Sequence, residues 1–259
     1  MSTTFYQIKC ITNLHVGSGE VNYNIVDNEV EKDAVTGLPV IHASGVKGAL
    51  RDNAVNTAGD DKDKKDIINK VFGYEGDSGV CNTGEFKFFD AVLLARPMRV
   101  YGSNSTSSVL VVSVDSINRY INMLKALKYK VDIEPINAPD FGNNQFLTNS
   151  TENIKVEAEN TGKIPSQLVD ELKKLGGIFD GVYAIVNNFN NYDLPVVARN
   201  YLEKGVSKNL WYEEVVPHGS ILYFAVISPD DFAGYTIPEF VQFGGNASIG
   251  CGYTQVTAI

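Results

Sequence analysis

Residues 25–51 read IVDNEVEKDAVTGLPVIHASGVKGALR, and this stretch largely decides which fold and site are predicted. It places an acidic, β-forming segment with Asp27, a Thr36-Gly37 turn, an apolar run and a basic helix start in close succession. A carboxylate that precedes a helix start rich in serine, glycine and lysine fits a site that holds a phosphodiester backbone near an acid.

The composition predicts a globular chain with a substantial core. The chain has 259 residues, of which 44% are hydrophobic, and this fits one elaborated domain over residues 1–259. The N-terminal residues MSTTFYQIKC contain no continuous apolar core, and no run reaches the ~20 apolar residues that a membrane span requires. Cys10, Cys81 and Cys251 are spaced too widely to signal a disulfide framework or a zinc motif. We therefore expect a soluble, cytoplasmic protein.

The formal net charge of −9 opposes one class of function. Domains that bind nucleic acid through bulk electrostatics are usually basic. A nucleic-acid site in this chain must therefore depend on a local basic surface and on main-chain N–H groups. The basic residues that could form such a surface are Lys47, Arg51, Arg96, Arg99 and Arg199.

The strands are predicted from alternation with a period of two. A half-buried strand over residues 4–16 places Tyr6, Ile8, Cys10 and Leu14 on one face and Gln7, Lys9, Asn13 and His15 on an open polar face. Further strands are predicted at 24–31, 85–94, 109–114, 182–186, 194–200, 209–215 and 220–227, and after the glycine-rich loop 244–252.

Helices are predicted at 44–57, 62–72, 116–128 and 166–175, with Ser44 and Ser166 as N-caps and Gly73 after the second helix. Residues 73–84 predict a mobile glycine-rich loop, and the weakly periodic residues 129–164 predict an insertion outside the core. The order of elements predicts an α+β fold, with a split βαβ core of the ferredoxin or RNA-recognition type.

The strongest local signal for ligand binding lies in residues 44–51. A helix N-terminus presents unpaired N–H groups to a phosphate, Gly45 and Gly48 permit close approach, and Lys47 adds a charge. The Walker A pattern is absent. An ordinary amphipathic helix with solvated Lys47 and Arg51 is the competing interpretation, and this segment taken alone favours it.

Other single signals are weaker. The segment FGGNASIGCG at 243–252 could cradle an anion or make a tight turn. A lone Asp27 or His15, and the acids Glu213 and Glu214 in LWYEE, are more often surface groups than catalysts.

In combination, several segments resemble RAMP (repeat-associated) proteins, and more narrowly the backbone subunit of the type III-B, or Cmr, CRISPR effector complex. They are LHVGSGE at 14–20, the segment 25–51, GEFKFFDAVLLARPMRV at 84–100, VARN at 197–200 with NLWYEEVVPHGS at 209–220, and FGGNASIGCG at 243–252.

The resemblance implies a modified ferredoxin-like, or RNA-recognition, RAMP fold with insertions and a β-hairpin thumb at about 199–210. It also implies an endoribonuclease whose copies form a helical filament on guide RNA and cut the paired target RNA at regular intervals. Its implied partners are guide CRISPR RNA, single-stranded target RNA, copies of itself and other Cmr subunits.

The resemblance also implies site residues. Asp27 matches the catalytic aspartate, and it could accept the proton of a 2′-hydroxyl or hold a divalent ion. Candidate supporting residues are His15, Glu213 and Glu214. Candidate RNA-binding residues are Ser44, Gly45, Lys47, Gly48, Arg51, Arg99, Arg199, Gly244, Gly245 and Gly250. Mg²⁺ or another divalent metal is implied as cofactor, although the sequence shows no multi-carboxylate cage.

Three alternatives stay open at this point. The first is the related type III-A backbone subunit with the same chemistry, and the second is a non-catalytic RNA-binding filament scaffold. The third is a guide-processing endonuclease that works alone, but no pair of catalytic histidines supports it.

Overall fold

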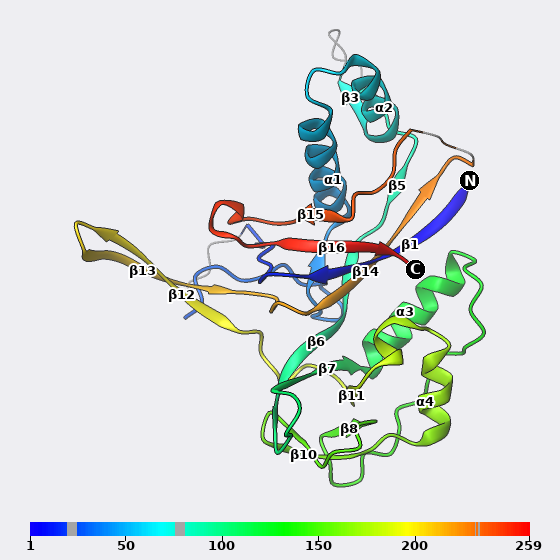
Figure 1. The fold of residues 1–259 in the computed structure, drawn as a ribbon, viewed down its shortest axis with the longest axis vertical. Helices are drawn as coiled ribbons and strands as arrows, with labels where there is room; N and C mark the ends of the chain where they lie inside the picture. The colour runs from blue at the N-terminus through cyan, green and yellow to red at the C-terminus, as the bar shows by residue number, and fades with distance from the viewer. Residues whose placement is uncertain (20–24, 76–80, 231, 233) are drawn as a thin grey trace.

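A large mixed β-sheet runs through the middle of the chain in the computed structural model (Figure 1). The structure describes residues 1–19, 25–75, 81–230, 232 and 234–259. Helices α1 and α2 lie at one end of the long axis, α3 and α4 lie toward the other end, and a two-stranded hairpin extends to one side. Among the described residues, no helix is long and apolar enough to cross a membrane.

The described part of the sheet has the strand order β15-β16-β1-β14-β6-β7-β11-β8-β10-β9, with β2 also paired to β6 and β5 to β14. The strands of this sheet are β1 (Ser2–Cys10), β2 (Val40–Ile41), β5 (Lys87–Phe88), β6 (Ala91–Tyr101), β7 (Ser108–Ser113), β8 (Phe146–Thr148), β9 (Lys155–Val156), β10 (Glu159–Lys163), β11 (Tyr183–Val186), β14 (Ile221–Ser228), β15 (Phe240–Gln242) and β16 (Tyr253–Ala258). The separate hairpins are β3 (Gly73–Glu75) with β4 (Cys81–Thr83), and β12 (Val196–Glu203) with β13 (Val206–Glu214).

The helices cover this sheet and connect its strands. They are α1 (Ala43–Ala58), α2 (Lys62–Phe72), α3 (Val114–Ala126), α4 (Ser166–Lys173) and the short 3-10 helices η1 (Gly177–Asp180) and η2 (Ala247–Ile249). Strand β14 is antiparallel to both β1 and β6, so β1 and β6 are parallel to each other with β14 between them. Because α1 lies between β1 and β6 in the chain, these elements form the predicted split βαβ unit.

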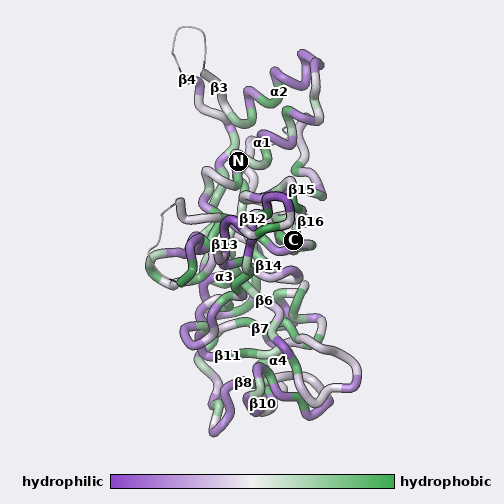
Figure 2. The backbone as a smooth tube through the Cα atoms, turned by 90° about the vertical axis from the view of Figure 1, so that its left-hand side faces the viewer, coloured by the Kyte–Doolittle hydropathy of each residue, from purple (hydrophilic) through white to green (hydrophobic). Residues whose placement is uncertain are grey.

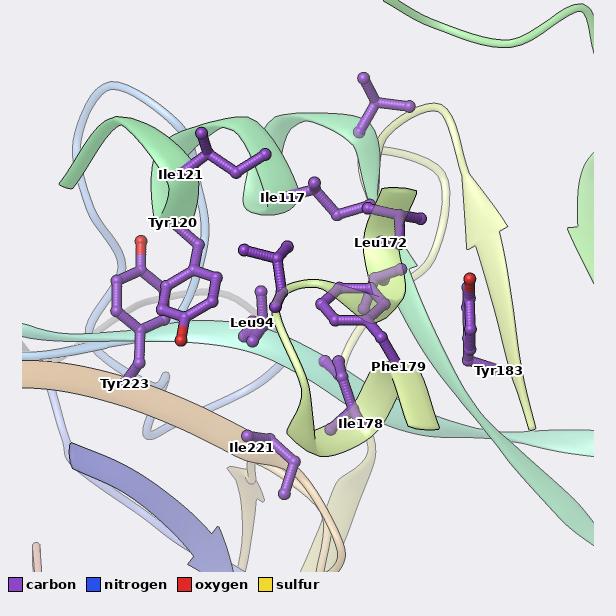
Figure 3. Packing of buried hydrophobic residues seen from close by; sticks show 14 of the residues in the cluster. Leu94, Ile117, Tyr120, Ile121, Leu172, Ile178, Phe179, Tyr183, Ile221 and Tyr223 are labelled. Carbon is purple, nitrogen blue, oxygen red and sulfur yellow. The ribbon is translucent and has the colours of Figure 1, made fainter. Parts of the chain in front are cut away.

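Strand β1 contributes to core clusters on both faces of the sheet, which differs from its predicted open polar face, although Lys9 is exposed as predicted. In β1, Ile8 and Cys10 pack in the cluster with α1 and α2, whereas Phe5 is fully buried on the opposite face beneath α3. The α3 side also holds Tyr120 against Tyr223, with ring centroids 4.6 Å apart (Figure 3). Figure 2 shows hydrophobic stretches along the central strands and more hydrophilic ones at the hairpin β12–β13.

Residues 129–164 are part of the core, so the prediction of an insertion outside it was wrong. Strands β8, β9 and β10 extend the sheet from β11 and return to β6. The fully or nearly fully buried residues of this segment include Ile133, Phe146, Leu147, Ile154 and Val156. Their partners lie far away in the sequence, and local periodicity therefore missed them.

The predicted bounds were correct for α2, whereas α3 (predicted at 116–128) begins and ends two residues earlier. Helix α2 has the predicted bounds, and Gly73 follows it with a φ of 80°. Helix α1 was predicted to have Ser44 as its N-cap, but His42 holds that position without a side-chain hydrogen bond. The carboxylate of Asp90, just before β6, instead accepts from the N–H of Ala43 at 2.7 Å.

Two other predicted elements also differ. The predicted strand 24–31 makes only isolated bridges within 25–31, and residue 24 lies outside the described residues. In the predicted loop 73–84, residues 76–80 lie outside the described residues, and the flanking segments pair as β3 and β4. The Ser166 cap was also misplaced, because Pro165 occupies the N-cap position of α4.

Candidate active site

Asp27 lies on the outer edge of β13, beside Tyr212 near the end of that strand. Figure 1 shows the hairpin β12–β13 projecting from the rest of the molecule. Its N–H donates to the carbonyl oxygen of Tyr212 at 3.0 Å, and the N–H of Tyr212 donates to Asp27 Oδ2 at 2.8 Å. The next residue, Asn28, pairs with Glu213 in a parallel bridge. Asp27 is exposed, and of its two carboxylate oxygens only Oδ2 has a hydrogen-bond partner among the described residues. One carboxylate oxygen is thus held in place while the other is available to a ligand.

Glu214 fastens the segment that follows Asp27. This buried carboxylate accepts from the N–H of Val30 at 3.0 Å through Oε2 and from Lys32 Nζ at 2.9 Å through Oε1. Its own N–H donates to the carbonyl oxygen of Asn28 at 2.9 Å. Because both carboxylate oxygens are occupied, Glu214 positions residues 28–32 and is not a free acid or base.

His15 joins three segments of the site, and it is buried instead of lying on an open polar face as predicted. Its Nδ1 lies 2.7 Å from the carbonyl oxygen of Glu214. A carbonyl oxygen only accepts, so Nδ1 donates the proton in this hydrogen bond. The carbonyl oxygen of His15 in turn accepts from the N–H of Gly245 at 2.9 Å. His15 therefore holds the base of β13 and the glycine-rich loop together.

Glu213 holds the base of the hairpin to the same loop. Its carboxylate accepts from Arg199 Nε at 3.1 Å, Trp211 Nε1 at 2.9 Å and Asn246 Nδ2 at 3.0 Å. Burial raises the pKa of Glu213, but hydrogen bonds from Trp211 and Arg199 and the Arg199 charge outweigh it and leave the pKa lowered. Glu213 is therefore ionised and fully engaged. Arg199, which also donates to Cys251 Sγ at 3.3 Å, is engaged here by protein groups.

The glycine-rich loop owes two of its glycines to close packing and turning. A Cβ on Gly244 would lie 2.3 Å from the carbonyl oxygen of His15, and its φ is 74°. Gly250 turns the chain with a φ of 82° and has open space around it. Since the N–H of Gly245 already donates to His15, it is not available for the predicted RNA contact. The loop therefore holds the main chain of His15 in place.

The start of α1 has the opposite character, because its polar groups are left open. Ser44, Gly45, Gly48 and Arg51 are exposed and Lys47 is half-buried. Within the part of the chain that the structure describes, Lys47 and Arg51 form no ion pair, and the N–H groups of Ser44 and Gly45 have no acceptor. An open start of a 16-residue helix with two free cations suits an anion such as phosphate.

Arg99 lies away from this constellation of contacts. It is exposed on β6, where its guanidinium donates to the Tyr101 hydroxyl at 3.2 Å and its N–H donates to Glu157 at 2.8 Å. Neither partner belongs to the candidate site. The structure therefore unites Asp27, His15, Glu213 and Glu214 through β13, and leaves Arg99 separate.

Several residues that build the site were not predicted. Tyr212 acts through its main chain, and Trp211, Asn246 and Lys32 act through contacts that no local pattern signals. Another missed contact is made by Arg119 of α3, which donates to Asp33 Oδ2 and to Thr36 Oγ1, each at 3.0 Å. That fork holds the turn after residues 28–32 against α3.

The described residues contain no group of three or more His, Cys, Asp or Glu side chains that could hold a metal ion. Asp27 could supply one oxygen ligand, which is compatible with Mg²⁺ that is bound mainly by water and substrate phosphates. The predicted metal dependence stays a prediction.

A model of the RAMP superfamily matches residues 7–255. The CRISPR system Cmr endoribonuclease Cmr4 of Pyrococcus furiosus is 23% identical over 283 aligned positions, which cover 95% of this chain and 92% of the relative.

Two solved structures have similar folds over nearly their whole length. A cryo-EM structure of the type III-B Cmr-beta complex bound to cognate target RNA contains a chain with a TM-score of 0.77 and 20% identity. The match covers 100% of this chain and 97% of that one. The crystal structure of oligomeric Cmr4 from Pyrococcus furiosus gives a TM-score of 0.70 at 20% identity, with 100% and 98% covered.

Proposed function

We propose that this chain, which belongs to the RAMP superfamily, is the backbone subunit of a type III-B RNA-guided complex. The chain has the α+β fold that was predicted from its sequence, and this fold is similar to that of a chain in a type III-B complex. In this role it binds guide RNA and cleaves the paired target RNA at regular intervals. The observation that carries the proposal is the exposed Asp27 carboxylate, fixed on β13 at the hairpin base in a chain similar to a Cmr endoribonuclease.

The proposed reaction uses the RNA's own 2′-hydroxyl as nucleophile. Asp27 accepts the 2′-hydroxyl proton, and the 2′-oxygen forms a bond to phosphorus while the bond from phosphorus to the 5′-oxygen breaks. The departing 5′-oxygen takes a proton from solvent, which leaves a 2′,3′-cyclic phosphate and a 5′-hydroxyl. Glu213 and Glu214 hold the geometry and transfer no proton, because both oxygens of each carboxylate are bonded to protein groups. His15 supports the site by holding the base of β13 through Nδ1.

A divalent ion, where it takes part, would have Asp27 as its protein ligand and would neutralise charge on the scissile phosphate. Chelation with EDTA is then expected to stop cleavage, and added Mg²⁺ is expected to restore it. Cleavage that persists at full rate in EDTA would contradict metal dependence and leave the role of Asp27 as a base intact.

The guide is proposed to bind at the open start of α1, through the free N–H groups of Ser44 and Gly45 and through Lys47 and Arg51. The hairpin β12–β13 is proposed to act as the thumb that wedges the duplex. It is longer than the range 199–210 expected from the sequence, since its strands run from Val196 to Glu214. Its exposed apolar residues are Val196, Tyr201, Leu202, Val206, Leu210 and Tyr212.

Copies of the chain are proposed to stack head to tail on the guide. A repeating phosphate track requires identical sites at a fixed spacing, and heterologous contacts between copies supply them. Because each subunit carries a net charge of −9, guide RNA is needed as a template that brings the copies together. Mass photometry against guide length is expected to show stepwise growth, whereas a strict 1:1 complex on long guides would contradict stacking.

The function is tested by Asp27→Ala in the complex assembled with guide RNA. Loss of a general base or metal ligand is expected to slow cleavage by ~10²-fold or more, with guide and target binding retained. Asp132→Ala is the matched control, since this exposed carboxylate makes no ion pair or hydrogen bond among the described residues. Normal cutting by the assembled Asp27→Ala complex would overturn the assignment, and absence of cutting by the wild type would favour a scaffold.

A further inference from the structure

We propose that the main-chain N–H of Tyr212 is a positioning group for the Asp27 carboxylate, so that the hairpin β12–β13 and this carboxylate are held as one unit. The inference rests on the proposed function. It adds that a main-chain donor of the hairpin orients the carboxylate.

The geometry that supports this is an irregular third strand on the hairpin. Residues 27–30 run along the outer edge of β13, with Asp27 N–H bonded to Tyr212 and Glu214 N–H bonded to Asn28. In a regular ladder, the N–H of Tyr212 would donate to a main-chain carbonyl. Here it donates to Asp27 Oδ2 at 2.8 Å, so the side chain of Asp27 takes the place of a main-chain acceptor.

The Tyr212 N–H has no role in holding the hairpin together. Tyr212 lies opposite Ala198, and antiparallel neighbours alternate between bonded and non-bonded pairs. Since the N–H and the carbonyl of Tyr212 both bond to residues 27 and 28, the pair with Ala198 is a non-bonded one. By the same geometry, Ala198 turns its own N–H away from β13.

The base of β13 is secured on several sides, which makes the unit rigid. Glu214 binds Val30, His15 binds the Glu214 carbonyl, and Glu213 binds Arg199, Trp211 and Asn246. The outer part of the same strand carries exposed apolar side chains such as Val206 and Leu210. A duplex that displaces the hairpin would therefore displace Asp27 with it.

The matched pair of variants is Tyr212→Pro and Ala198→Pro. Each puts a proline on an outward-facing position of a hairpin edge, where it removes no hairpin bond. Only Tyr212→Pro removes the donor to Asp27. Single-turnover cleavage by the assembled complex is expected to fall by ~10²-fold in Tyr212→Pro, because a shift of about 1 Å in a reacting group has an effect of that size.

The residual cuts of Tyr212→Pro are expected to scatter around the wild-type positions. Tyr212→Ala, which keeps the main-chain N–H and removes the exposed side chain, is expected to keep the wild-type cut positions. Ala198→Pro is expected to cut at the wild-type positions and rate. Equal loss of cleavage in both variants, or wild-type cutting by Tyr212→Pro, would overturn the inference. Asp27→Ala is measured in parallel: if it still cuts, the proposed function fails, and if it alone is inactive, only the positioning role fails.

A second measurement does not depend on the folding of a proline variant. Hydrogen exchange at the Tyr212 amide is followed by NMR in the wild type and in Asp27→Ala. The amide is expected to exchange slowly in the wild type and much faster in Asp27→Ala, which lacks the acceptor. The same exchange rate in both proteins would show that the carboxylate is not held by this N–H.

Discussion

The two ends of the segment 25–51 differ in how their polar groups are used. Around Asp27, the polar groups that hold the segment are engaged: Asp27, Asn28, Val30 and Lys32 each bond to Tyr212 or Glu214 of β13. At the start of α1, the N–H groups of Ser44 and Gly45 and the charges of Lys47 and Arg51 lack partners among the described residues. A reacting group needs a fixed position, whereas a binding surface needs open donors, and one short segment provides both.

Glu214→Ala disrupts the hydrogen bonds that hold the segment after Asp27, and we expect it to have the largest effect on cleavage. It leaves the Val30 N–H and Lys32 without their acceptor and frees residues 28–32. We expect cleavage to fall by ~10²-fold and the free energy of unfolding to fall by ~1–3 kcal/mol, as for a buried polar group left unpaired.

Single-turnover kinetics and denaturant unfolding measure these effects. Glu134→Ala is the control, since it removes only an exposed ion pair with Lys125 far from the site. Full cleavage activity in Glu214→Ala would show that residues 28–32 keep their position without this carboxylate.

Lys47→Ala combined with Arg51→Ala tests the open end. Guide affinity is expected to fall roughly tenfold, and the slope of log affinity against log salt is expected to flatten by about one to two units. The cleavage rate at saturating guide should change little. Lys64→Ala with Lys65→Ala on α2 removes the same charge from lysines that pair with Asp61 and Asp60. An equal change of slope in both double variants would mean that α1 contributes only general charge.

Arg119→Ala tests the turn that lies between Asp27 and the start of α1, because Arg119 donates to Asp33 and Thr36 of that turn. The Arg119 guanidinium, with help from Thr36, holds the pKa of Asp33 well below its usual range although partial burial opposes this. A lowered folded-state pKa stabilises the protein above the unfolded pKa of about 4, and this stability is lost as the pH falls through the folded value.

Wild-type stability should therefore decline on acidification more steeply than that of Arg119→Ala. At neutral pH, the variant should be ~1–3 kcal/mol less stable. Urea unfolding between neutral and acidic pH measures both, and parallel pH profiles would contradict a contribution from Asp33.

The smallest expected effect is a difference in chemical reactivity among the three cysteine thiols. Burial raises the pKa of Cys10 to about 12, and Cys251 is also buried, whereas Cys81 is exposed. A cysteine-alkylating reagent, which reacts with the thiolate form, is expected to modify Cys81 readily and the other two cysteines only on unfolding. Rapid modification of Cys251 would indicate that the contact between Arg199 and the glycine-rich loop opens in solution.

The sequence allowed the fold class to be predicted, because it depends on local periodicity and on motifs, whereas the functional roles of the candidate site residues stay predictions. Helix α2 and Gly73 were predicted correctly since capping there is local. The cap of α1 was not, because Asp90 reaches it from another strand. Asp27 and His15 were found by motif, but the partners that fix them are a main-chain N–H and a distant carbonyl, and no residue pattern encodes either.

The central claim is that a charged carboxylate at position 27, held on β13, cuts guide-paired RNA. Asp27→Asn tests it most directly, because the amide oxygen can still accept from Tyr212 while the charge is lost. The measurement maps the cut positions and end groups of a guide-matched target in assembled wild-type and Asp27→Asn complexes. We predict regularly spaced cuts with 2′,3′-cyclic phosphate ends in the wild type, and an intact, fully bound target in Asp27→Asn. The same ladder of cuts from Asp27→Asn would contradict the claim.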